Sequence, residues 1–102
     1  MNLFKVPVAK RWCYTIYFEE VAGIGTFAHC DIHTRWSKLT KQMLLSGWHL
    51  VNTAHGGPIY AEHDPKDKKH EKFLYMFGFV HHETLKDGKQ IWLWRKKTQI
   101  TF

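Results

Sequence analysis

Histidine and carboxylate side chains alternate along one expected strand, in the run HCDIH. His29, Asp31 and His33 occupy alternate positions of that run, and alternate strand residues share a face at a spacing of about 7 Å. Imidazole and carboxylate groups are zinc ligands, so the three side chains are candidate metal ligands. On a straight strand the two histidines would lie about 13 Å apart, too far for one ion. The alternative is a polar strand that faces solvent.

Aromatic and cationic residues are interleaved near both ends of the chain. If Ile91 and Leu93 face the core, the neighbouring tryptophans point outward beside Lys96, as in a platform that stacks single-stranded nucleic acid. In the opposite orientation both tryptophans are core residues and Arg95 extends to the surface at the edge. The candidate binding residues are Lys10, Arg11, Trp12, Trp92, Trp94, Arg95, Lys96 and Lys97.

The charge balance indicates what kind of partner the surface would attract. The chain has 15 Lys and Arg against 9 Asp and Glu, a formal net charge of +6. A basic surface favours polyanions, so the sequence predicts a small non-catalytic module that binds nucleic acid or an acidic protein surface. A short basic domain of this kind also suits a phage- or plasmid-type accessory protein that inhibits a host complex.

Enzyme and targeting motifs are missing from the sequence. It contains no nucleophile elbow, glycine-rich phosphate loop or dinucleotide fingerprint, so no cofactor is predicted and an enzyme is disfavoured. Cys13 and Cys30 are the two cysteines; buried free thiols are expected, and a single bridge remains open. The first ten residues lack a signal-peptide run and no stretch is long enough to span a membrane, which predicts a cytoplasmic protein.

Hydrophobic periodicity predicts one domain, residues 1–102, with an α+β fold. We expect one helix packed on a mainly antiparallel sheet of about five or six strands. Edge strands of such a sheet could pair two copies into a homodimer. The predicted elements are strands 11–21 and 26–33, joined by a hairpin connection at Gly23-Ile24-Gly25, a helix from 35 or 36 to about 46 ended by Gly47, strands 48–53 and 59–62, a polar loop 63–72, and strands 73–82 and 90–100, with a hairpin turn centred on Asp87-Gly88 between the last two.

Residues 39–63, which read LTKQMLLSGWHLVNTAHGGPIYAEH, resemble the core of HicA-type toxins. These are small, basic, mRNA-cleaving ribonucleases with a double-stranded-RNA-binding-like fold. Their helix is followed by a Gly-aromatic pair, a strand, a glycine-containing turn and a strand with an aromatic residue. Here Gly47-Trp48, Gly56-Gly57 and Tyr60 follow that order.

The resemblance implies an alternative function, a metal-independent ribonuclease. His55 would be its general acid or base, and Lys68, Lys69 and Lys72 would hold phosphate. The catalytic histidine of the family is not matched, because Pro58 stands where that histidine should follow the glycines.

Overall fold

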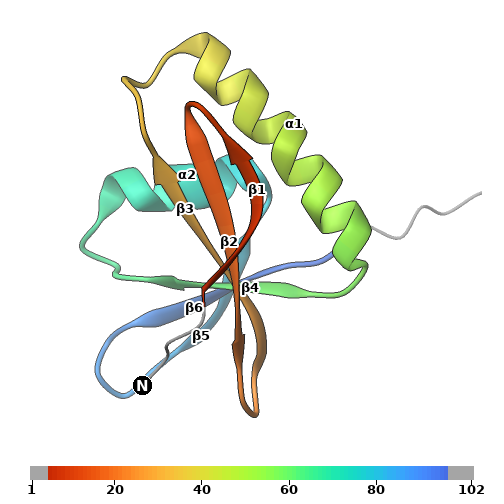
Figure 1. Cartoon of the computed structure of the whole chain (residues 1–102). Helices are drawn as coiled ribbons and strands as arrows, with labels where there is room; N and C mark the ends of the chain where they lie inside the picture. Colours follow the sequence, from red (N-terminus) through yellow and green to blue (C-terminus); the bar gives the residue numbers. More distant parts are fainter. Residues whose placement is uncertain (1–4, 97–102) are drawn as a thin grey trace, which may run out of the picture.

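The computed structural model describes residues 5–96 as two helices and one six-stranded mixed sheet (Figure 1). The predicted α+β fold class is confirmed. No helix in the described residues is long and apolar enough to cross a membrane. The elements in chain order are β1 (Val6–Arg11), β2 (Tyr14–Val21), β3 (Gly25–Ile32), α1 (Lys38–His55), β4 (Ile59–His63), α2 (Lys68–Phe77), β5 (Val80–Thr84) and β6 (Gln90–Trp94).

The sheet has the order β1-β2-β3-β4-β6-β5. All neighbouring strands are antiparallel except β3 and β4, which run in the same direction. The predicted hairpin of β2 and β3 is confirmed, with eight residues of each strand in register. The predicted turn between β5 and β6 is also present, where the Asp87 side chain accepts a hydrogen bond from the Lys89 backbone N–H. β1 was not predicted, because its residues are mostly exposed and show no alternation.

Helix α1 is longer than predicted. Ser37 caps its N-terminus by accepting a hydrogen bond from the backbone N–H of Thr40. Gly47 does not end the helix but lies inside it, where a Cβ atom would overlap the hydroxyl of buried Tyr14. The helix ends at Gly56 in the left-handed conformation, with φ of 74°. The predicted end near residue 46 and the predicted strand 48–53 are therefore wrong.

Helix α2 replaces the second half of the predicted loop 63–72 and the first half of the predicted strand 73–82. The Asp67 side chain caps it by accepting a hydrogen bond from the His70 backbone N–H, and Gly78 ends it with φ of 92°. The apolar residues Phe73, Leu74 and Phe77 follow helical spacing and pack toward the core. The start of this helix was not predicted, because its first turn is polar. The last strand, β6, is shorter than predicted and ends at Trp94.

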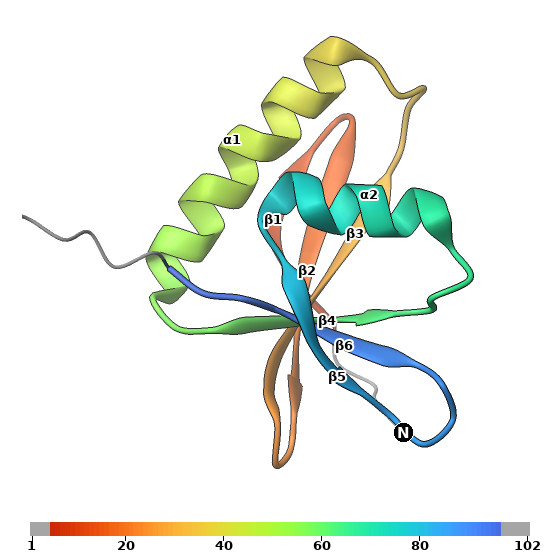
Figure 2. The same cartoon turned by 180° about the vertical axis from the view of Figure 1, so that it is seen from behind.

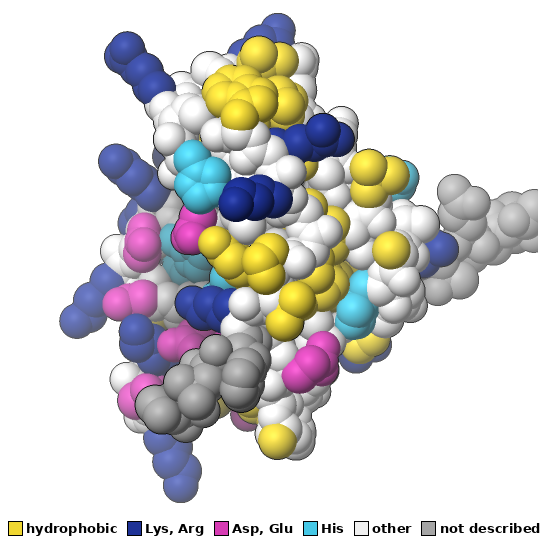
Figure 3. Space-filling view, in the orientation of Figure 1, with side chains coloured by type: hydrophobic (Ala, Val, Ile, Leu, Met, Phe, Trp, Pro, Cys, Tyr) yellow, Lys and Arg dark blue, Asp and Glu magenta, His cyan; other side chains and the backbone are white. Residues whose placement is uncertain are grey.

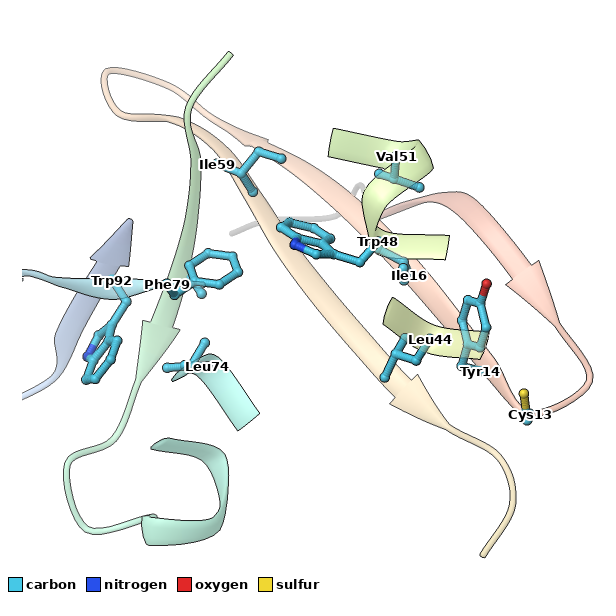
Figure 4. Close-up of a cluster of buried hydrophobic side chains, with 11 residues drawn as sticks. Cys13, Tyr14, Ile16, Leu44, Trp48, Val51, Ile59, Leu74, Phe79 and Trp92 are labelled. Atoms are coloured by element: carbon cyan, nitrogen blue, oxygen red, sulfur yellow. The ribbon is translucent and has the colours of Figure 1, made fainter. Parts of the chain in front are cut away.

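Both helices pack on one face of the sheet and share one core (Figures 2 and 4). Trp48 of α1 joins the two helices, since its ring contacts Phe77 and its Nε1–H donates a hydrogen bond to the Phe77 carbonyl. The buried hydrophobic residues of this core are Cys13, Tyr14, Ile16, Leu44, Trp48, Val51, Ile59, Ala61, Leu74, Phe79 and Trp92.

Candidate functional site

The two parallel strands of the sheet separate soon after they meet. Among the described residues, β3 and β4 share a single pair in register, Phe27 with Tyr60. On the sheet face away from the helices the rings of these two residues stack, with centroids 5.6 Å apart. Toward their C-terminal ends the strands diverge, and α2 lies across the opening (Figures 1 and 2). A cavity of about 250 Å³ lies between the two diverging strands and α2.

Small side chains line the diverging strands and aromatic side chains line the helices. Ala28 and Cys30 of β3 and Ala61 of β4 leave room between the strands. The inner wall is formed by Ile16, Trp48, Phe73, Leu74, Phe77 and Phe79. The outer part is polar and is lined by Lys5, His29, Asp31, Glu62 and His70. The cleft therefore has a polar mouth and an apolar interior.

A histidine–carboxylate pair lies at the mouth of the cleft. His29 Nε2 is 2.7 Å from Glu19 Oε1, and the Glu19 side chain is largely buried. An ionised carboxylate accepts but does not donate, so Nε2 carries the proton. The lone pair of Nδ1 is then available to accept a proton, as in a general base. The sequence drew attention to His29, but its partner Glu19 comes from the neighbouring strand β2.

Cys30 lines the cleft as a neutral thiol. Burial, followed by the charge of Asp31, raises the pKa of Cys30 to about 12. A thiol becomes a strong nucleophile only as the thiolate. Cys30 therefore contributes space and a soft apolar surface to the cleft, and both described cysteines are free thiols.

A second histidine pair joins β4 to the start of α2. His63 Nδ1 and His70 Nδ1 are 2.8 Å apart, so one ring donates to the other. His63 is 1% exposed and packs against Trp92. Its Nε2 has no hydrogen-bond partner within residues 5–96. Burial, and then the proximity of His63, lowers the pKa of His70, while Asp67 opposes this shift.

We expect this pair to make stability fall with acid. The pKa of His70 is lower in the folded than in the unfolded chain, so folding favours the neutral ring. Its contribution is therefore complete above the unfolded-state pKa, about 6.5, and is lost as pH falls below it. Urea midpoints measured at pH 7.5 and 5.0 should differ more in the wild type than in His70→Gln. Equal differences in the two proteins would contradict the assignment.

The loop before α1 contacts a residue that lines the cleft. The ring of Trp36 lies 5.5 Å, centroid to centroid, from that of Phe73, which lines the cavity. Arg35 and Lys38 are exposed on either side of the Ser37 cap. The first turn of α1 contains no acidic residue. This segment combines cationic side chains with the positive end of a helix, an arrangement that favours an anion.

The candidate metal ligands do not converge. His29 is bonded to Glu19, whereas His33 Nε2 lies 2.7 Å from Thr15 Oγ1. In the part of the chain that the structure describes, no group of three or more His, Cys, Asp or Glu side chains could hold a metal ion. The alternating run HCDIH instead places His29 beside the cleft.

His55 lies in a hydrogen-bond network that connects elements of the fold. Its Nδ1 accepts a hydrogen bond from the Gly57 backbone N–H, and its Nε2 lies 3.0 Å from Thr26 Oγ1. Thr26 in turn donates to Glu20. The ring thereby ties the end of α1 to the hairpin of β2 and β3. The lysines paired with His55 in the ribonuclease hypothesis, Lys68, Lys69 and Lys72, lie on α2.

The candidate ring–cation platform is not assembled. Trp92 is 2% exposed in the core and Trp94 is half-buried against Trp48, whereas Trp12 is 65% exposed. The two β6 tryptophans thus point toward the helices, so the outward orientation is wrong. On the face in Figure 3, Lys and Arg side chains are spread among acidic and hydrophobic ones. The remaining candidates are Lys10 and Arg11 on β1, Arg95 and Lys96 after β6, and Lys97, which lies outside the described residues.

Comparison with known proteins identifies the fold. The sequence matches no family model and no curated protein. The structure is similar to the GNAT domain of PAT from S. lividans, with a TM-score of 0.64 and 15% sequence identity. The match covers 80% of this chain and 53% of the other, so the chain spans about half the length of that domain. At this identity the similarity establishes the fold alone.

This similarity corrects the function predicted from the sequence. The neighbour is a GNAT acetyltransferase domain, not a HicA-type toxin. The interpretation of residues 39–63 as a HicA-type core is wrong. Helix α1 continues through Gly47, and His55 is hydrogen-bonded to Thr26 in a network that joins α1 to the β2–β3 hairpin. The fold likewise gives no support to a non-catalytic module for nucleic acid or acidic proteins, or to a phage- or plasmid-type inhibitor.

Proposed function

We propose that this chain binds an acyl thioester of coenzyme A between β3 and β4 and transfers the acyl group to an amine. The observation that carries the proposal is the divergence of these parallel strands after one paired position. Separated strands offer backbone N–H and C=O groups to an extended ligand that has amides of its own. The arm of coenzyme A is such a ligand, and the 250 Å³ cavity gives it a place to lie.

The phosphates of the donor would lie at the loop before α1. Arg35, Lys38 and the exposed backbone N–H groups at the start of the helix provide positive charge there. The loop has no glycine, so side chains, rather than a close approach of the backbone alone, would supply much of the binding.

His29 would act as the general base. The amine nitrogen attacks the thioester carbonyl carbon, a C–N bond forms and the C–S bond breaks. The amine loses a proton to His29 Nδ1, and the thiolate leaves with the electron pair of the broken bond. Glu19, 2.7 Å away, stabilises the imidazolium that results. Asp31 and Glu62 at the mouth would attract an amine that arrives as a cation, which releases one proton to solvent before its nitrogen attacks; the second proton is the one that His29 accepts.

The proposal predicts saturable binding of coenzyme A, measurable by calorimetry. A combined Arg35→Gln and Lys38→Gln variant should weaken binding about tenfold or more, because the loss of even one charge-assisted hydrogen bond costs about 1.5–3 kcal/mol. Lys86→Gln, which removes another exposed cation, from the turn between β5 and β6, should bind as the wild type does. Absence of binding, or equal loss in both variants, would refute the proposed phosphate site.

Three further expectations accompany the proposal. A cytoplasmic location, where coenzyme A thioesters are available, stays a prediction. So does a homodimer formed through an edge strand, for which β1 and β5 are the ends of the described sheet. Binding of a polyanionic partner elsewhere on the basic surface is likewise untested.

A further inference from the structure

His70 is held in the first turn of α2 by two hydrogen bonds. Its backbone N–H donates to the Asp67 side chain at 3.0 Å, and its Nδ1 lies 2.8 Å from Nδ1 of His63 on β4. The same residue lines the cavity between β3 and β4. Because His63 occupies Nδ1, the polar atom that the ring of His70 can offer to a ligand is Nε2.

The surroundings of His63 decide which ring donates in this pair. His63 is almost fully buried, and its Nε2 has no hydrogen-bond partner in residues 5–96. If His70 donated from Nδ1, the neutral ring of His63 would have to carry its proton on Nε2 and would bury an N–H without an acceptor. A buried N–H without an acceptor is rarer in protein structures than an acceptor with an unused lone pair. His63 therefore donates from Nδ1, and His70 carries its proton on Nε2.

The charge state of His70 agrees with this arrangement. Burial, and then the proximity of His63, lowers the pKa of His70, so its ring is neutral near pH 7. A neutral ring can accept the hydrogen bond from His63, whereas an imidazolium has no lone pair with which to accept. The Nε2–H group is thus a neutral donor, which suits an uncharged acceptor such as an amide carbonyl.

Few other side chains of the cleft can donate to a carbonyl oxygen. The other ring N–H groups are engaged, that of His29 by Glu19 at 2.7 Å and that of Trp48 by the Phe77 carbonyl at 3.2 Å. Ionised carboxylates only accept hydrogen bonds. Among the described side chains that line the cleft, the free donors are the His70 Nε2–H, the Lys5 ammonium and the weak Cys30 S–H.

We infer that His70 donates a hydrogen bond from Nε2 to an amide carbonyl in the arm of coenzyme A, and that His63 is the positioning residue that fixes His70 in the required tautomer. This inference rests on the proposed function, which places the arm between β3 and β4. The arm has two amide groups and would otherwise meet walls that are largely apolar. A carbonyl that is buried without a donor weakens binding, so this contact supports affinity for the arm.

The tautomers can be observed in the wild-type protein by multiple-bond ¹H–¹⁵N NMR of its imidazole rings. At pH 7.5 His70 should carry its proton on Nε2 and His63 on Nδ1. A His70 ring protonated on Nδ1 overturns the inference. In His63→Phe the ring of His70 should lose its fixed tautomer and show a mixture. Addition of coenzyme A to the wild type should slow the exchange of the His70 Nε2 proton with solvent. Unchanged exchange at saturation overturns the contact.

Two ligands distinguish a contact with the arm from an effect on the fold. They are coenzyme A and 3′-phosphoadenosine 5′-diphosphate, which keeps the phosphates but lacks the arm. His70→Phe should weaken binding of coenzyme A about threefold to tenfold, the usual contribution of one neutral hydrogen bond, and leave binding of the nucleotide unchanged. His63→Phe should weaken binding of coenzyme A about twofold, because about half of the His70 rings would be in the binding tautomer. His49→Phe changes an exposed histidine that does not line the cleft and should bind both ligands as the wild type does.

The outcomes separate this inference from the proposed function. A loss confined to coenzyme A, together with the Nε2–H tautomer, supports the inference. Binding of coenzyme A that His70→Phe leaves unchanged, or an equal loss for both ligands, overturns the inference and leaves the proposed function intact. Failure of the wild type to bind coenzyme A overturns both. If His70→Phe does not fold, as judged by thermal melting, the tautomer and the proton exchange of the wild type decide.

Discussion

Replacing His29 with glutamine is expected to lower kcat/KM for acyl transfer about a hundredfold or more, the usual contribution of a positioned general base. Glutamine retains a hydrogen-bond donor toward Glu19 but cannot accept the proton of the amine. The affinity for coenzyme A should change less than turnover does, because the phosphates would bind the loop before α1 and not His29. The assay follows the release of free thiol from acyl-coenzyme A donors in the presence of a panel of amines.

Two further variants serve as controls for His29→Gln. His33→Gln changes a histidine two residues farther along the chain, one that is bonded to Thr15 and does not line the cleft. It should retain wild-type turnover. Glu19→Gln should lower kcat and alter the pH profile without abolishing donor binding, because Glu19 positions His29 and stabilises its protonated form. If His29→Gln keeps wild-type activity, the proton is removed by another group.

The sequence identified His29 as chemically interesting but assigned it the wrong companions. Alternation correctly placed His29 on the same face as Asp31, since strand periodicity is local. The pairing with Glu19 depends on the register between β2 and β3, which no local pattern reveals. The cleft depends on a parallel contact between β3 and β4, two strands separated in the chain by α1. A site formed by the divergence of two strands leaves no motif in either one.

The fold was predictable where local signals agreed. The alternating strands around the glycine turn at residue 23 gave the β2–β3 hairpin, and Asp87-Gly88 gave the last turn. The predicted helix end at Gly47 was wrong, because a glycine after an apolar helical stripe has the pattern of a helix C-terminus. Its actual role is to make room for Tyr14, a residue 33 positions earlier in the chain that lies against α1 in the folded protein. Tertiary packing thus decided where α1 ends.

The sequence does not show which face of the last strand is turned toward the helices. Alternation divides residues 91–94 into two faces but does not say which face is buried, because both carry large apolar side chains. The structure buries Trp92, whose ring lies 5.4 Å from that of His63 and 5.0 Å from that of Tyr75. Its Nε1–H donates to Gln90 at 2.9 Å, so even its polar atom is satisfied internally.

Trp92→Ala should therefore lower the free energy of unfolding by about 3–5 kcal/mol, the cost of truncating a buried Trp. Trp12→Ala removes the same side chain at a position that is 65% exposed and should change it by less than about 0.5 kcal/mol. Urea unfolding at pH 7.5 measures both. Similar small losses would mean that Trp92 is a surface ring after all. A large loss confined to Trp92 would mean that the ring supports the strand pairing of β4 with β6, and with it the β4 wall of the cleft.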